Sequence, residues 1–161
     1  MKIEPQDHFC NWQQDPQGNY LARLVFPKKA ERFTVTVDLT ADMTAINPFD
    51  FFLESIAEKF PFPYDSWLHH ELAPFLVVSE PRQLLDDWFK QADIHIERTI
   101  DWLMAVNQKL QQDIRYEIRM EPGVQSAEDT LRRKAGSCRD SAWLLVNLLR
   151  HKGLATRFAS G

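Results

Sequence analysis

The chain has 161 residues, of which 44% are hydrophobic and 26% charged, and its formal net charge is −4. This is the composition of an ordinary globular domain with a real core, and it excludes a disordered or collagen-like chain. No apolar run approaches the roughly 20 residues that cross a bilayer. The first residues lack an apolar signal-peptide stretch. We therefore expect a cytoplasmic chain with no membrane segment.

Neither nucleic acid nor a metal ion is expected as a partner. A nucleic-acid-binding protein would show a basic excess, and the two basic clusters, 132–134 and 150–152, are short enough to be helix ends. Structural zinc sites use about four closely spaced Cys and His ligands, and the chain has only Cys10 and Cys138 as cysteines. A Cys10–Cys138 disulfide is conceivable, but free thiols are the expectation for an intracellular chain. No cofactor is indicated.

The first part of the chain, residues 1–46, has the pattern of a small antiparallel β-domain. Residues 32–39 alternate polar and apolar side chains with a period of two, and residues 20–26 are rich in β-forming residues. The segments 15–19 and 27–31 are typical of turns. Two or three antiparallel strands result, too few to cover their own apolar face. Cys10, beside Phe9 and Trp12 and just before a strand, is interpreted as a packing residue.

Residues 47–80 form a connector in this interpretation. A short helix is predicted to open at 47–52, whereas the alternating prolines of 60–64 exclude a regular element there. The aromatic rings of this segment could line a peptide groove, but the favoured interpretation is that they hold the connector against the core.

Helical patterns follow from Pro81 onward. Apolar residues recur on one face of a first helix after Pro81 and then, at spacings of three to four, through a long helix from about Ile96 to Ile114. Residues 115–120 favour a short strand. Ser126 followed by Asp129 is typical of a cap for a helix from 127 to about 135.

The stretch from Gly136 to Gly153 carries the chemistry. Ser137 with Asp140 three residues on indicates a capping box, and Gly153 can close the helix in the left-handed conformation. Residues 142–149 are apolar nearly all round, which indicates a buried helix.

Cys138 would then lie on the first turn of that helix. Free N–H groups and the positive end of the helix dipole favour a thiolate there, and Arg139 would add positive charge if its side chain turned inward. The thiolate is the nucleophilic form of cysteine. A small buried cysteine that only packs is the alternative.

Residues 136–140, the apolar helix after them, and the segment 154–161 resemble the core of bacterial transglutaminase-like cysteine hydrolases. Residues 126–131 resemble the lead-in helix of that core. The strands after Asp15 are similar to the β-domain that precedes it in bacterial members, and residues 54–76 to the connector. The likeness spans most of the chain and is sharpest at 126–161, where order and spacing both fit.

The resemblance implies a papain-like fold in which a Cys at a helix N-terminus faces a His and an Asp on the following sheet. Cys138 would be the nucleophile, forming a thioester with an amide or peptide substrate that water or an amine resolves. Its backbone N–H would help to hold the oxyanion. Whether hydrolysis or transamidation follows, and on which substrate, stays open.

The sequence departs from the family at the catalytic base. The family's His and Asp follow the Cys by several dozen residues, whereas only His151 follows Cys138, 13 residues on in the same helix and thus roughly 20 Å away. We expect His69 and His70 to be solvated linker residues and His95 to open the long helix at the surface; with His8 they precede Cys138, where the family has no catalytic position. Asp140 could be read as the triad acid, but capping its helix explains it first.

We therefore predict an α+β chain with three parts: a β-domain at 1–46, a connector at 47–80, and at 81–161 the helical half of a transglutaminase-like core, truncated before its catalytic sheet and ending on that sheet's first strand. The expected function is that of an inactive fragment of a cysteine hydrolase or protease that acts on a protein or peptide substrate. The alternative is a non-catalytic protein-binding module on the same scaffold. Self-association is expected through a helix face left uncovered, which would include Trp143 and Val146.

Overall fold

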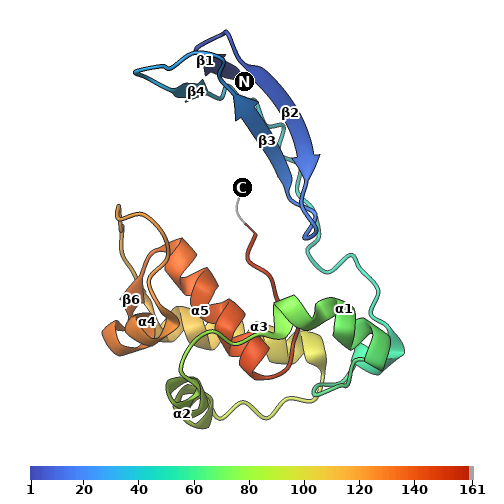
Figure 1. The fold of residues 1–161 in the computed structure, drawn as a ribbon. Coiled ribbons are helices and arrows are strands. Elements are labelled where there is room, and N and C mark those ends of the chain that lie inside the picture. The colour runs from blue at the N-terminus through green and yellow to red at the C-terminus, as the bar shows by residue number, and fades with distance from the viewer. Residues whose placement is uncertain (160–161) are drawn as a thin grey trace. The chain divides into compact units, whose positions relative to one another are not determined.

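The computed structural model describes residues 1–159 and divides the chain into two compact units, Met1–Asp50 and Phe51–Gly161. The first unit is built of strands. The second is built mainly of helices (Figure 1). The predicted α+β class is confirmed. Within residues 1–159, no helix is both long and apolar enough to span a membrane.

Four strands form two antiparallel pairs in the first unit: β1 (Lys2–Glu4) with β4 (Thr34–Thr36), and β2 (Phe9–Gln14) with β3 (Tyr20–Val25). The turn between β2 and β3 forms as predicted. Asp15 accepts a hydrogen bond from the Asn19 amide at 2.8 Å, and Gly18 has a φ of +82°. The left-handed conformation at Gly18 favours glycine because it has no Cβ.

Two expectations for this unit are wrong. The strand predicted at 32–39 is paired only at 34–36, because its partner β1 offers just three residues. Cys10 lies within β2 rather than before a strand, and its side chain is exposed rather than packed. A two-stranded sheet has no second layer to bury such a side chain.

The segment expected to open a helix at 47–52 forms a turn instead. Asn47 Oδ1 accepts a hydrogen bond from the Phe49 amide at 3.0 Å, and the Asn47 carbonyl accepts one from the Asp50 amide at 3.2 Å. Asparagine side chains often bond the backbone two residues on in this way, which competes with helix formation.

The second unit contains five α-helices, a 3₁₀ turn (Ser55–Ala57) and two short strands. The helices are α1 (Ser66–Leu76), α2 (Arg82–Ala92), α3 (Thr99–Asp113), α4 (Ala127–Arg133) and α5 (Cys138–His151), and the strands are β5 (Arg115–Tyr116) and β6 (Ala135–Gly136).

Helix α1 was not predicted. Asp65 caps it, because its Oδ1 accepts hydrogen bonds from the Trp67 and Leu68 amides, both at 2.9 Å. The connector therefore holds a helix of 11 residues after its irregular, proline-rich stretch. His69 and His70 lie on this helix and are exposed, as expected for solvated residues.

Helix α5 is the centre of the second unit and contacts each of the other four helices (Figure 1). The core is formed by buried apolar side chains of α2, α3 and α5, among them Leu85, Val106, Leu144 and Leu148. The Phe60 ring of the connector stacks on Trp102 with 4.1 Å between ring centroids. This confirms that the aromatic rings hold the connector against the core.

Helix α3 begins three residues later than predicted. The Phe60 amide donates to the Glu97 carbonyl at 2.7 Å, and the Thr99 amide donates to the Glu58 carbonyl at 3.0 Å. The connector thus pairs with residues 97–99 as an extended segment, so the chain before Thr99 cannot be helical. His95 consequently lies outside the helix, although it is exposed as expected.

Two other predicted elements are shorter. The strand expected at 115–120 is paired only at 115–116, because β6, its parallel partner, has two residues before α5 begins. The helix expected from 127 to about 135 ends at Arg133, where Lys134 takes a left-handed conformation with a φ of 49°.

After α5, Gly153 adopts the predicted left-handed conformation with a φ of +85°. The strand expected over 154–161 is not present in the described part, 154–159; residues 160 and 161 lie outside it. The backbone amides of this segment bond to α1 and the connector instead of to a strand. The Ala155 amide donates to Tyr64 Oη and the Thr156 amide to the Phe75 carbonyl, both at 3.0 Å.

One face of α5 is less open than predicted. Val146 is only 4% exposed, and Trp143 is half-buried with its Nε1 donating to Glu80 at 3.3 Å. Val146 was therefore wrongly assigned to an exposed patch. Self-association of the chain stays a prediction.

Candidate functional site at the start of α5

Cys138 is the first residue of α5, and its side chain is exposed. It is therefore not a buried packing residue. Its amide belongs to the first turn of the helix, where N–H groups have no carbonyl of the helix to donate to. Cys10 and Cys138 are both free thiols.

The predicted capping box at this helix start is present. The Asp140 carboxylate accepts hydrogen bonds from the Ser137 amide at 2.9 Å and from Ser137 Oγ at 2.7 Å. Gly136 makes the arrangement possible, since a Cβ at this position would lie 2.9 Å from the Cβ of Asp140. Ser137, the residue before Cys138, is thus held by the carboxylate of Asp140, which follows two residues after the cysteine.

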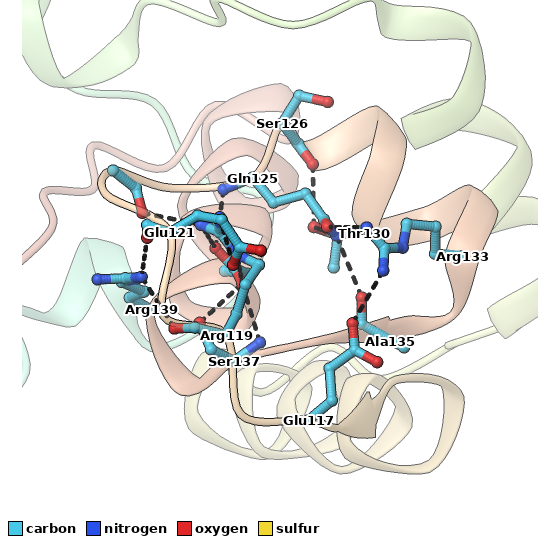
Figure 2. A network of polar contacts seen from close by, with 12 residues as sticks. Glu117, Arg119, Glu121, Gln125, Ser126, Thr130, Arg133, Ala135, Ser137 and Arg139 are labelled. Carbon is cyan, nitrogen blue, oxygen red and sulfur yellow. Dashed lines mark hydrogen bonds and ion pairs between the residues drawn. The ribbon is translucent and has the colours of Figure 1, made fainter.

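Asp140 also accepts hydrogen bonds from Arg119, a residue that the sequence pattern did not indicate. Arg119 Nε and Nη2 donate to the two carboxylate oxygens at 2.8 and 2.9 Å, and the Gln125 amide donates at 2.7 Å. The Asp140 side chain has no exposed surface, and that of Arg119 is 14% exposed. Arg119, Gln125 and Ser137 are labelled in Figure 2, where dashed lines mark the hydrogen bonds of this network.

The pKa of Asp140 lies far below its usual range, chiefly because Arg119 hydrogen-bonds the carboxylate. Burial acts in the opposite direction, and the amides of Gln125 and Ser137 add to the lowering. Hydrogen bonds to the charged form favour ionisation. Asp140 is thus a structural anion, and its assignment to the helix cap is supported by its contacts.

The hydrogen bonds of the Arg139 side chain are made to the loop before α4 and not to Cys138. Its Nη2 donates to the carbonyls of Arg119, at 3.1 Å, and Glu121, while its Nε is buried without a hydrogen-bond partner among the described residues. The side chain therefore ties the loop before α4 to the start of α5 (Figure 2).

A second group of contacts joins this loop to α4. Gln125 Nε2 donates to Thr130 Oγ1 at 2.9 Å and to the Ala135 carbonyl at 3.1 Å. Arg133 bridges Gln125 Oε1 and Glu117 Oε1, each at 3.1 Å (Figure 2). Ser126 caps α4 as predicted, accepting from the Asp129 amide at 3.0 Å. The loop that faces the thiol's helix is therefore fixed at both ends.

None of the histidines forms a hydrogen bond with Cys138 within residues 1–159. His151 ends the same helix, and its Nε2 lies 2.7 Å from Asp86 Oδ1. His95 pairs with Asp93 at the surface, and in the first unit His8 Nδ1 lies 2.7 Å from the Pro5 carbonyl. In residues 1–159 there is also no cluster of His, Cys, Asp and Glu that could hold a metal ion.

The ion pair of Asp140 makes a prediction about stability and pH. The pKa of Asp140 is lower in the folded chain than in an unfolded one. Its ion pair therefore stabilises the fold at pH values above about 4, the ordinary pKa of an aspartate. This stabilisation is lost as the pH falls below that value. We expect urea midpoints to fall between pH 5 and pH 3 more steeply in the native chain than in Asp140→Asn. Parallel curves would contradict the assignment.

Two regions of the chain match known protein families. Residues 1–42 match the bacterial transglutaminase-like N-terminal region, and residues 91–161 match the core of the transglutaminase-like superfamily. No curated protein and no solved structure matches the chain.

The two matched regions follow each other in the chain in the order that the sequence resemblance implied, and the second contains the whole of α5. Residues 1–42 and 91–161 are thus transglutaminase-like regions. The scaffold around Cys138 is therefore that of a transglutaminase-like core.

Proposed function

We propose that Cys138 is the nucleophile of a transglutaminase-like cysteine hydrolase or protease that acts on amide or peptide bonds. The observation that carries the proposal is an exposed thiol on the first turn of a buried, capped helix within the matched core. Cysteines at such helix starts often have a stabilised thiolate form.

In the proposed reaction, the Cys138 thiolate adds to the substrate carbonyl carbon and forms a tetrahedral oxyanion. In this proposal the backbone N–H of Cys138 donates to that oxyanion. Collapse breaks the carbon–nitrogen bond and leaves a thioester, and the amine departs with a proton. Water or a second amine then attacks the thioester, so the acyl group is transferred and the thiol is regenerated.

Proton transfer in this scheme needs a base and acid that Cys138 does not contact in the described residues. Thiolate formation at residue 138 and proton transfer to the leaving amine are separate requirements. We propose that the 161-residue polypeptide supplies the first and not the second, and that by itself it is inactive.

Selective alkylation tests the nucleophile. We expect iodoacetamide below pH 8 to label Cys138 about two- to fivefold faster than Cys10 in the folded chain, the size of a helix-dipole effect at an exposed site. Because both thiols are exposed, the comparison reports reactivity rather than access. Peptide mass spectrometry measures both rates in one sample. Faster labelling of Cys10, or equal labelling rates of the two thiols in the folded chain, would contradict the proposal.

The second candidate is a non-catalytic module that binds protein or peptide on the same scaffold. It is favoured by the lack of a histidine in contact with Cys138 in the part of the chain that the structure describes. The two candidates differ at the thiol: Cys138→Ala leaves peptide binding unchanged in a binding module but removes acyl transfer from an enzyme.

A further inference from the structure

A buried negative charge lies in the same helix turn as the proposed nucleophile. Asp140 is two residues from Cys138 in the first turn of α5, and its carboxylate has no exposed surface. A like charge nearby disfavours a thiolate, and burial weakens the screening of that repulsion by water. A transglutaminase-like nucleophile at residue 138 therefore needs this carboxylate to be neutralised.

Arg119 supplies the opposite charge in a fixed geometry. Its guanidinium meets both oxygens of Asp140, and Nη2 also donates to the Gly123 carbonyl at 2.8 Å. A planar guanidinium can make this two-pronged contact, whereas a lysine ammonium supplies only a point charge. The Arg119–Asp140 pair has no net charge, so the free N–H groups of the helix start and the positive charge of Arg139 are left to determine the field at Cys138.

We propose that Arg119 is a positioning residue for Cys138: through Asp140 it holds the first turn of α5 and cancels the negative charge beside the thiol. The inference rests on the proposed role of Cys138 as nucleophile. It gives a function to an ion pair at this helix start whose two side chains are both largely shielded from solvent.

The other charged groups around α5 are paired, exposed or at its far end, except Arg139, which adjoins Cys138 at the start of the helix. Glu121 is exposed and 3.7 Å from Arg119 Nη1, and Arg139 bonds loop carbonyls. On the helices packed against α5, Arg133 of α4 pairs with Glu117 and Asp86 of α2 pairs with His151. Lys109 and Asp113 of α3 pair with each other. The charged or titratable side chains of α1, namely Glu71, His69 and His70, are exposed.

Removal of the Arg119 charge would leave Asp140 ionised. The carboxylate keeps three donors, the Gln125 amide and the amide and hydroxyl of Ser137, and such donors favour the charged form. In Arg119→Gln the thiol would thus face an uncompensated anion.

The test compares pH profiles of Cys138 alkylation in the full 161-residue chain, with Cys10 as the internal reference. In Arg119→Gln we expect the alkylation rate of Cys138 to fall about three- to tenfold at pH 7, because repulsion by Asp140 moves the pH profile upward by about half to one pH unit. At high pH the rate should return to the native value. Arg119→Lys is expected to keep most of the native profile. Arg133→Gln, which alters an arginine of the same network that does not touch Asp140, is expected to leave it unchanged.

The double variant Arg119→Gln, Asp140→Asn separates charge from structure. It removes both charges, so we expect the native profile to return, and it keeps the test decisive if Arg119→Gln alone does not fold. A native profile in folded Arg119→Gln, or a double variant as slow as the single one, would overturn the inference. If Cys138 of the unmodified chain reacts no faster than Cys10, the proposed function fails instead.

Discussion

Replacement of Asp140 by alanine is expected to lower the free energy of unfolding by about 3–5 kcal/mol, the usual cost of removing one partner of a buried ion pair. The variant would leave the guanidinium of Arg119 and the amides of Gln125 and Ser137 without their common acceptor. Unsatisfied buried donors pay their full desolvation penalty. Urea unfolding followed by tryptophan fluorescence measures the loss.

Asp101→Ala is the matched control. Asp101 is also a carboxylate in the first turn of a helix and pairs with an arginine, Arg98, at 3.1 Å. That pair is exposed, so its loss is expected to cost no more than about 1 kcal/mol. Equal losses in the two variants would show that Asp140 acts only as an ordinary helix cap.

The second large effect concerns catalysis. We expect a polypeptide of these 161 residues to show no amidase, peptidase or transamidase turnover above that of Cys138→Ala. General acid–base catalysis contributes about 10²- to 10⁴-fold, and a thiol without an adjacent base loses its activation as well. Release of a chromophore from peptide anilides would measure turnover. Robust activity that Cys138→Ala abolishes would contradict the expectation.

The local features of the site could be predicted because they depend on residues close together in the chain. The capping box of Ser137 and Asp140, the cap at Ser126 and the left-handed Gly153 each follow from spacings of one to four residues. Helix α1 carried the same kind of signal in Asp65, but the prolines before it favoured an irregular connector through the whole segment.

The contacts that fix the site are not local and could not be predicted. Arg119 lies 21 positions before Asp140, in a stretch whose alternating pattern favoured a strand. That pattern does hold exposed apolar side chains at Tyr116, Ile118 and Met120, but strand pairing ends at residue 116 because β6 is so short. A charged residue between exposed apolar neighbours gives no sign of a buried partner.

The start of α3 was misplaced for a similar reason. Ile96 continues the apolar spacing of the helix, but the backbone at 97–99 is taken by hydrogen bonds to residues 58–60 of the connector. Tertiary pairing overrides the local pattern here. Sequence periodicity identifies which face is buried more reliably than it locates the residue where an element begins.

Acylation by an activated ester tests most directly whether Cys138 is the nucleophile. p-Nitrophenyl acetate carries a leaving group that needs no proton from the protein, so the first half-reaction does not require a base beside Cys138. We expect one burst of p-nitrophenol per chain and an acetyl group on the Cys138 peptide that persists, since no histidine of residues 1–159 hydrogen-bonds this thiol to activate water. Cys10→Ser should keep the burst and Cys138→Ala should lose it. Acetylation of Cys10 at the same rate, or an unmodified Cys138, would contradict the account.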